Sequence, residues 1–134
     1  MVAAADLVIE ASRPRALAAV GLDPFTVVEA WATSGLSITG HGRIDDPDRI
    51  GFGDDAAVAG GLWIDDPGGP MFVGDAVADP VAGLAAAAMA AELPVAERAS
   101  AVEVPLSRAG AWAQGRPMTA PGEPEGGGWG GAMG

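Results

Sequence analysis

Asp79 is the residue of this sequence whose type and position best suit a chemical reaction. It stands directly before Pro80 and a run rich in alanine, which predicts a helix over residues 79–93. Asp is a favoured N-cap and Pro a favoured first helical residue, so a capping role would explain the pair. Alternatively, the carboxylate could attack an acyl carbonyl while unpaired N–H groups of the first turn stabilise the oxyanion. Gly83 and the alanines would let a bulky substrate come close.

Other polar residues are weaker candidates for chemistry. His41 lies between glycines with no Ser or Cys partner, so we interpret it as a solvated loop histidine. Three acids of the same loop could bind a cation, but they lack EF-hand spacing and a terminal Glu, which favours a solvated loop: Asp45, Asp46 and Asp48. Asp54 and Asp55 suit the first turn of a short helix, with an active-site role as the alternative. No metal site is predicted.

The composition excludes some classes of function. The 134 residues include 18 acidic side chains and only 7 basic ones, all Arg, for a net charge of −11. Such a surface repels phosphate backbones and anionic lipids, so we expect no nucleic-acid or membrane partner. The chain contains no Cys, and no apolar run approaches the ~20 residues that span a bilayer. The first residues lack a basic stretch typical of a signal peptide. These features predict a cytoplasmic protein.

Apolar patterning predicts alternating strands and helices. Strands are expected at 6–11, 36–40 and 101–106, and a strand–turn–strand unit at 62–74. Helices are expected after Ser12 as a cap, from Pro24 to residue 32, at 54–60, at 79–93 and near 107–114. Phe25, Val28 and Trp31 should form the apolar stripe of the second helix, and Trp31, Trp63 and Trp112 should be core residues. The alternation predicts an α/β layered domain with a largely parallel sheet over residues 1–114. Residues 115–134 form a Gly/Pro-rich segment expected to be a flexible tail.

Four segments in order resemble the middle of the family III CoA-transferases (CaiB/BaiF family) over about residues 4–114. They read "DLVIEASRPRALAAVGLDP", "LSITGHGR", "GFGDDAAVAGGLW" and "GGPMFVGDAVADPVAGLAAAA". The resemblance implies a Rossmann-like domain in which Asp79 is the nucleophile. The Asp would attack an acyl-CoA thioester to give an anhydride, and CoA would return to form an aspartyl-CoA thioester before transfer to a second carboxylic acid. The family also contains 2-methylacyl-CoA racemases, but "ADPVAG" lacks their glycine run, which favours the transferase branch.

The resemblance also implies what surrounds the reaction. Acyl-CoA and a carboxylic acid would be substrates, no other cofactor is needed, and a homodimer or a complementary segment is expected because family chains are longer and form interlocked dimers. We therefore expect a central part of the large domain, incomplete relative to the family. An inactive or partner-dependent fragment without turnover is the alternative. The acid or Gln that the family often carries before its "SGL"-like segment is represented here by Gly53, with Asp54 one place off, and by Ala57.

Overall fold

The computed structural model describes residues 4–22, 24–43, 48–95 and 97–115. The segment 116–134, where the tail was predicted, lies outside these residues. The described elements follow one another as β1 (Leu7–Glu10), α1 (Pro14–Ala18), α2 (Pro24–Trp31), β2 (Ser34–Thr39), α3 (Gly53–Ala59), β3 (Trp63–Asp66), β4 (Gly69–Phe72), α4 (Ala78–Glu92), the 3₁₀ helix η2 (Leu93–Val95), β5 (Ala101–Pro105) and α5 (Leu106–Ala113). The predicted mixture of strands and helices is confirmed.

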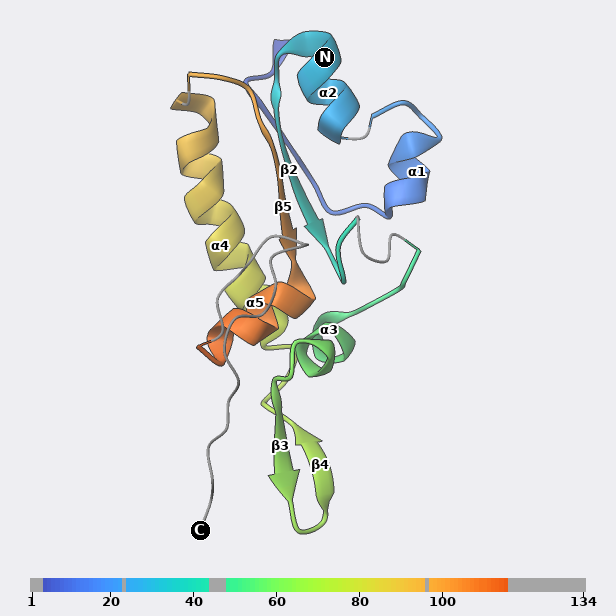
Figure 1. Cartoon of the computed structure of the whole chain (residues 1–134), viewed down its shortest axis with the longest axis vertical. Helices are drawn as coiled ribbons and strands as arrows, with labels where there is room; N and C mark the ends of the chain where they lie inside the picture. The colour runs from blue at the N-terminus through green and yellow to red at the C-terminus, as the bar shows by residue number, and fades with distance from the viewer. Residues whose placement is uncertain (1–3, 23, 44–47, 96, 116–134) are drawn as a thin grey trace, which may run out of the picture.

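Three parallel strands form the centre of the fold in the order β1-β2-β5. Figure 1 shows α4 on one side of these strands and α2 on the other. Neighbouring residues of β2 therefore pack against different helices, because strand side chains alternate between the two faces of the sheet. Leu36 belongs to the core cluster with α4, whereas Gly35 packs against Pro24 of α2. The largely parallel sheet predicted from the sequence is confirmed.

The main core lies between the sheet and α4. Leu36 and Val104 of the sheet are fully buried, and they pack in one cluster with three alanines of α4 that are four residues apart: Ala78, Ala82 and Ala86. Residues spaced by four lie on one face of a helix, so the alanines form a smooth stripe that lets α4 lie close to the strands. The alanine-rich run thus has a packing role as well as a high helix propensity.

The opposite face of the sheet carries a polar network at its carboxyl end. Arg43 forms an ion pair with Glu10, and both side chains also bond to the hydroxyl of Ser37. The side chains of the ion pair are only 9% and 10% exposed. Nearby, the Thr39 hydroxyl donates to Glu103 at 3.0 Å and accepts from the Gly42 amide at 3.1 Å. These bonds fix the turn that leaves β2 against the ends of β1 and β5.

Antiparallel strands β3 and β4 form the predicted strand–turn–strand unit. Both strands extend further into the turn than expected, so only Pro67 and Gly68 connect them. Gly69 opens β4 with φ +115°, a conformation that suits glycine and permits the tight reversal. In Figure 1 the hairpin extends away from the sheet beyond α3 and α5.

Several local predictions were wrong. Arg13, not Ser12, is the N-cap residue of α1, with Pro14 at the first helical position and no side-chain cap. In α2 the buried residues are Pro24 and Val27 rather than the predicted stripe. The predicted core tryptophans are 40%, 44% and 56% exposed: Trp31, Trp63 and Trp112. The small core is filled by Leu, Val and Ala, which leaves these indoles at the surface.

Candidate functional site

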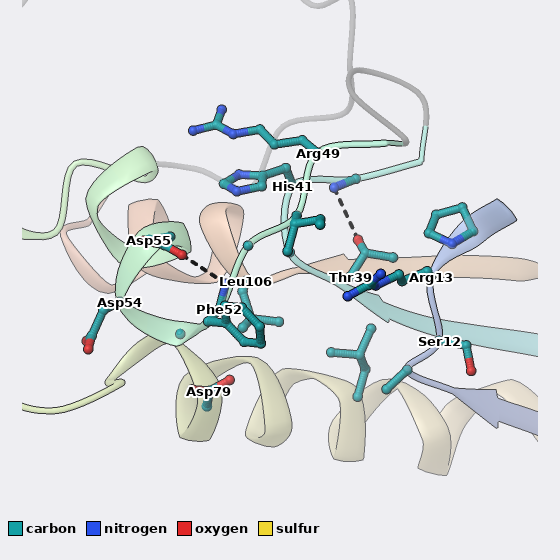
Figure 2. A pocket seen from close by; sticks show the side chains of 18 of the residues that line it. Ser12, Arg13, Thr39, His41, Arg49, Phe52, Asp54, Asp55, Asp79 and Leu106 are labelled. Atoms are coloured by element: carbon teal, nitrogen blue, oxygen red, sulfur yellow. Dashed lines mark hydrogen bonds between the residues drawn. The ribbon is translucent and has the colours of Figure 1, made fainter. Parts of the chain in front are cut away.

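A cavity of about 750 Å³ opens at the carboxyl end of the parallel strands. Its walls come from the segments that follow β1 and β2, from the starts of α3 and α5, and from the first turn of α4 (Figure 2). In α/β proteins with parallel strands, ligands bind preferentially at this end of the sheet. The volume lies in the range of small-molecule sites.

Asp79 lines this cavity from the first turn of α4. Its side chain is exposed, as a residue that meets a substrate must be. The predicted cap role is wrong, because α4 already begins at Ala78 and Val77 is its N-cap residue. The position in the first turn still favours a negative charge through the helix dipole.

The amide donors predicted beside Asp79 are used within the chain. The Asp79 amide donates to the carbonyl of Ala76 at 3.0 Å, and the Val81 amide donates to the carbonyl of Val77 at 3.4 Å. Pro80, between them, has no N–H. These residues of the first turn therefore do not supply the oxyanion donors that the sequence pattern suggested.

Gly53, the first residue of α3, lies directly against the carboxylate of Asp79. A Cβ added at Gly53 would be 2.9 Å from Cγ of Asp79, closer still to Oδ2, and 2.8 Å from the Cβ of Ala76. Real Cβ atoms essentially never approach other atoms so closely. Because residue 53 has no side chain, the carboxylate of Asp79 can lie against the start of α3.

The two acids in the first turn of α3 accept hydrogen bonds from different backbone amides. Asp54 accepts a hydrogen bond from the Ala76 amide at 2.9 Å through Oδ1. Asp55 accepts one from the Phe52 amide at 3.4 Å through Oδ2, shown as a dashed line in Figure 2. The prediction of two first-turn acids is confirmed. Only the tertiary structure shows that Asp54 reaches the segment before α4.

Three of the seven arginines of this acidic chain line the cavity: Arg13, Arg15 and Arg49. Arg15 is 4.0 Å from Asp48, and both side chains are largely exposed. The sequence interpretation did not treat these arginines as site residues. The signal that could have found them is the "RPR" segment directly after the first strand, because residues at that point must lie at the carboxyl edge of a parallel sheet.

The structure places the remaining candidates differently from the prediction. His41 lines the cavity but is only 8% exposed, so the expectation of a solvated histidine is wrong. Its ring packs on Gly51, where an added Cβ would be 2.8 Å from Cδ2. Asp45 and Asp46 lie outside the described residues, and Asp48 is exposed. Among the residues that are described, no group of three or more His, Asp or Glu side chains could hold a metal ion.

Within the described part of the chain, no helix has the length and apolar character needed to cross a bilayer.

Comparison with known proteins gives structural relatives only. No family model and no curated protein matches the sequence. A hypothetical protein from Mycobacterium tuberculosis, Rv3272, is similar with a TM-score of 0.74 and 21% identity, over 85% of this chain and 36% of that one. A CaiB/BaiF family protein from Brucella suis is similar with a TM-score of 0.66 and 25% identity, over 83% of this chain and 32% of that one.

The chain thus spans about a third of the length of these relatives. The likeness to the Mycobacterium tuberculosis protein concerns the fold, since the identity is low. The likeness to the Brucella suis protein extends over most of this chain and includes 25% sequence identity. The chain therefore has the fold of a CaiB/BaiF family protein, and the resemblance predicted from its sequence is confirmed.

Proposed function

We propose that this chain carries the nucleophilic carboxylate of a CoA-transferase, and that Asp79 is this nucleophile. The observation that carries the proposal is the position of Asp79: an exposed carboxylate in a cavity at the carboxyl end of a parallel sheet. The similarity to a CaiB/BaiF family protein supports the reaction class. A carboxylate that reaches solvent and substrate at a helix start is suited to covalent catalysis on an acyl group.

The proposed reaction proceeds in balanced steps. An oxygen of Asp79 attacks the carbonyl carbon of an acyl-CoA thioester, the C–S bond breaks, and a mixed anhydride and CoA thiolate form. The thiolate then attacks the aspartyl carbonyl, which gives an aspartyl-CoA thioester and releases the donor acid. An acceptor carboxylate attacks this thioester to form a second mixed anhydride, and the returning thiolate takes the acceptor acyl group and frees Asp79.

The remaining lining of the cavity suits such a thioester. The guanidinium groups of Arg13, Arg15 and Arg49 offer positive charge for the phosphates of CoA in a chain that is otherwise strongly acidic. Phe52 and Phe72 line the same cavity and are 71% and 54% exposed. Their rings provide apolar surface for an acyl or pantetheine chain.

The proposal concerns the first half of the reaction most directly. Because this chain spans only about a third of the length of the solved relatives, full turnover, the choice of acids and the expected homodimer or complementary segment are part of the proposal. Formation of the aspartyl anhydride and thioester requires the carboxylate, a bound acyl-CoA and hydrogen-bond donors for the oxyanion, which the first turn of α4 does not supply.

Trapping with hydroxylamine tests the proposal. The folded protein, checked by circular dichroism, is incubated with acetyl-, succinyl- and 2-methylacyl-CoA and hydroxylamine, and its peptides are examined by mass spectrometry. We expect a hydroxamate at Asp79 that depends on acyl-CoA, that is lost in Asp79→Ala and that persists in Asp75→Ala. Asp75 is the matched control because it is an exposed acid four residues earlier that does not line the cavity.

Two results would count against the proposal. A folded protein without any adduct at Asp79 would indicate that the residue does not act as a nucleophile in this chain. Exchange of the α-proton of a 2-methylacyl-CoA with deuterium from D₂O, without a hydroxamate, would indicate racemase chemistry instead.

A further inference from the structure

Ala76 adopts a backbone conformation that alanine avoids. Its φ is +50°, in the left-handed region, where a Cβ meets the following carbonyl oxygen. Among the described residues, only Ala32 is another non-glycine residue with a positive φ. Such a conformation persists only where the surrounding structure holds it, and it is found most often beside functional sites. Ala76 lies three residues before Asp79.

A chain of hydrogen bonds joins α3 to Asp79 through this residue. The Ala76 amide donates to Oδ1 of Asp54 at 2.9 Å, and the Ala76 carbonyl accepts from the Asp79 amide at 3.0 Å. A bond to a carboxylate is stronger than one between neutral groups. Asp54 therefore holds the amide group of Ala76, and the amide of Asp79 bonds to the carbonyl group of the same residue.

The residue before Asp54 completes the arrangement. Gly53 lies against both Ala76 and the carboxylate of Asp79. The first two residues of α3 thus determine both the backbone that leads into α4 and the space in which the Asp79 side chain lies. The described core does not require this link, because Ala78, Ala82 and Ala86 hold α4 on the sheet independently.

We propose that Asp54 is a positioning residue for Asp79: its carboxylate holds Ala76 in the left-handed conformation and thereby sets the direction in which the Asp79 carboxylate enters the cavity. This inference rests on the proposed function of Asp79. This role differs from the usual role of an acid in the first turn of a helix, which is a favourable interaction with the helix dipole. Asp55 could provide that interaction equally well. Figure 2 shows the two side chains leaving α3 in different directions.

Four variants separate positioning from a general effect on stability. Asp54→Ala removes the acceptor, whereas Asp54→Asn keeps an oxygen that can accept from Ala76. Asp55→Ala removes the neighbouring first-turn acid, which accepts a hydrogen bond from the Phe52 amide. In the double variant Asp54→Ala/Ala76→Gly, glycine takes a positive φ without strain, so the need for Asp54 should largely disappear.

The first measurement is amide hydrogen exchange followed by nuclear magnetic resonance. In Asp54→Ala we expect exchange at Ala76 and Asp79 to become about tenfold faster or more, because a hydrogen bond to a charged group is lost. The amides of Ala86 and Ala87, inside α4, should be unchanged. Asp55→Ala should stay within about twofold of the unchanged protein, and Asp54→Asn should lie between the unchanged protein and Asp54→Ala, because a neutral acceptor forms a weaker bond.

The second measurement is the rate of hydroxamate formation at Asp79 over a range of acyl-CoA concentrations. In Asp54→Ala the maximal rate should fall by about tenfold to a hundredfold, since small displacements of a reacting group have effects of this size, while the half-saturating concentration is retained. The double variant with Ala76→Gly should recover most of the loss.

Failure of the positioning role of Asp54 can be distinguished from failure of Asp79 as the nucleophile. If the unchanged protein gives no hydroxamate, the proposed function fails, and the exchange rates at Ala76 and Asp79 alone decide whether Asp54 positions this segment. Exchange at Ala76 that Asp54→Ala leaves unchanged, or equal effects of Asp54→Ala and Asp55→Ala, would overturn the positioning role.

Discussion

Gly53 and Asp79 come from different helices, yet the α-carbon of one lies against the carboxylate of the other. An added Cβ at Gly53 would be 2.9 Å from Cγ of Asp79. The contact makes Asp79 sensitive to any side chain at residue 53.

We expect Gly53→Ala to destabilise the protein by about 1–3 kcal/mol, because the new methyl group overpacks the space between Ala76 and Asp79. Urea unfolding measures this change. In the double variant Gly53→Ala/Asp79→Ala the shorter side chain at residue 79 should restore part of the stability. The double-mutant cycle then gives the coupling free energy between residues 53 and 79. Additive effects of the two substitutions would contradict the contact.

Gly83→Ala should stabilise the protein rather than destabilise it. Gly83 lies in the interior of α4, its side is exposed, and an added Cβ meets nothing within 4 Å. Alanine should therefore stabilise the protein by about 0.5–1 kcal/mol through its helix propensity. Urea unfolding under the same conditions checks this. A loss of stability would indicate that a neighbour occupies this side of α4 in solution.

Arg43→Met should be among the most damaging single substitutions. It leaves the nearly buried Glu10 carboxylate without its ion-pair partner, which costs about 3–5 kcal/mol in comparable cases. The variant Arg43→Met/Glu10→Gln should regain much of this loss because no unpaired charge remains. Thermal and urea unfolding measure both, and a loss below ~1 kcal/mol for Arg43→Met would show that water reaches the pair.

Leu36→Ala should cost about 2–5 kcal/mol, since Leu36 is fully buried and its removal leaves a cavity between the sheet and α4. Trp112→Ala should cost much less, although it removes more atoms, because the indole is 56% exposed. The comparison of the two urea midpoints tests whether Trp112 lies at the surface rather than in the core. A larger loss for Trp112→Ala would indicate that this side chain is covered in solution.

The sequence by itself determined the elements and their type. Short β-branched runs, an alanine-rich stretch after Asp-Pro and turn residues between them predicted the order of strands and helices, because these signals act within a few residues. They also predicted a parallel sheet and drew attention to Asp79. Its identity as a nucleophile is still a proposal that rests on the resemblance and on its place in the cavity.

Only the tertiary structure decided which residues meet. Gly53 with Asp79 and Asp54 with Ala76 are contacts between segments more than twenty positions apart, and no local pattern encodes such distances. The exposure of Trp31, Trp63 and Trp112 and the burial of His41 depend likewise on how α4 and the loops cover the sheet. Hydrophobicity predicts that a side chain prefers the interior, but the packing of small residues between the sheet and α4 determines how much interior exists.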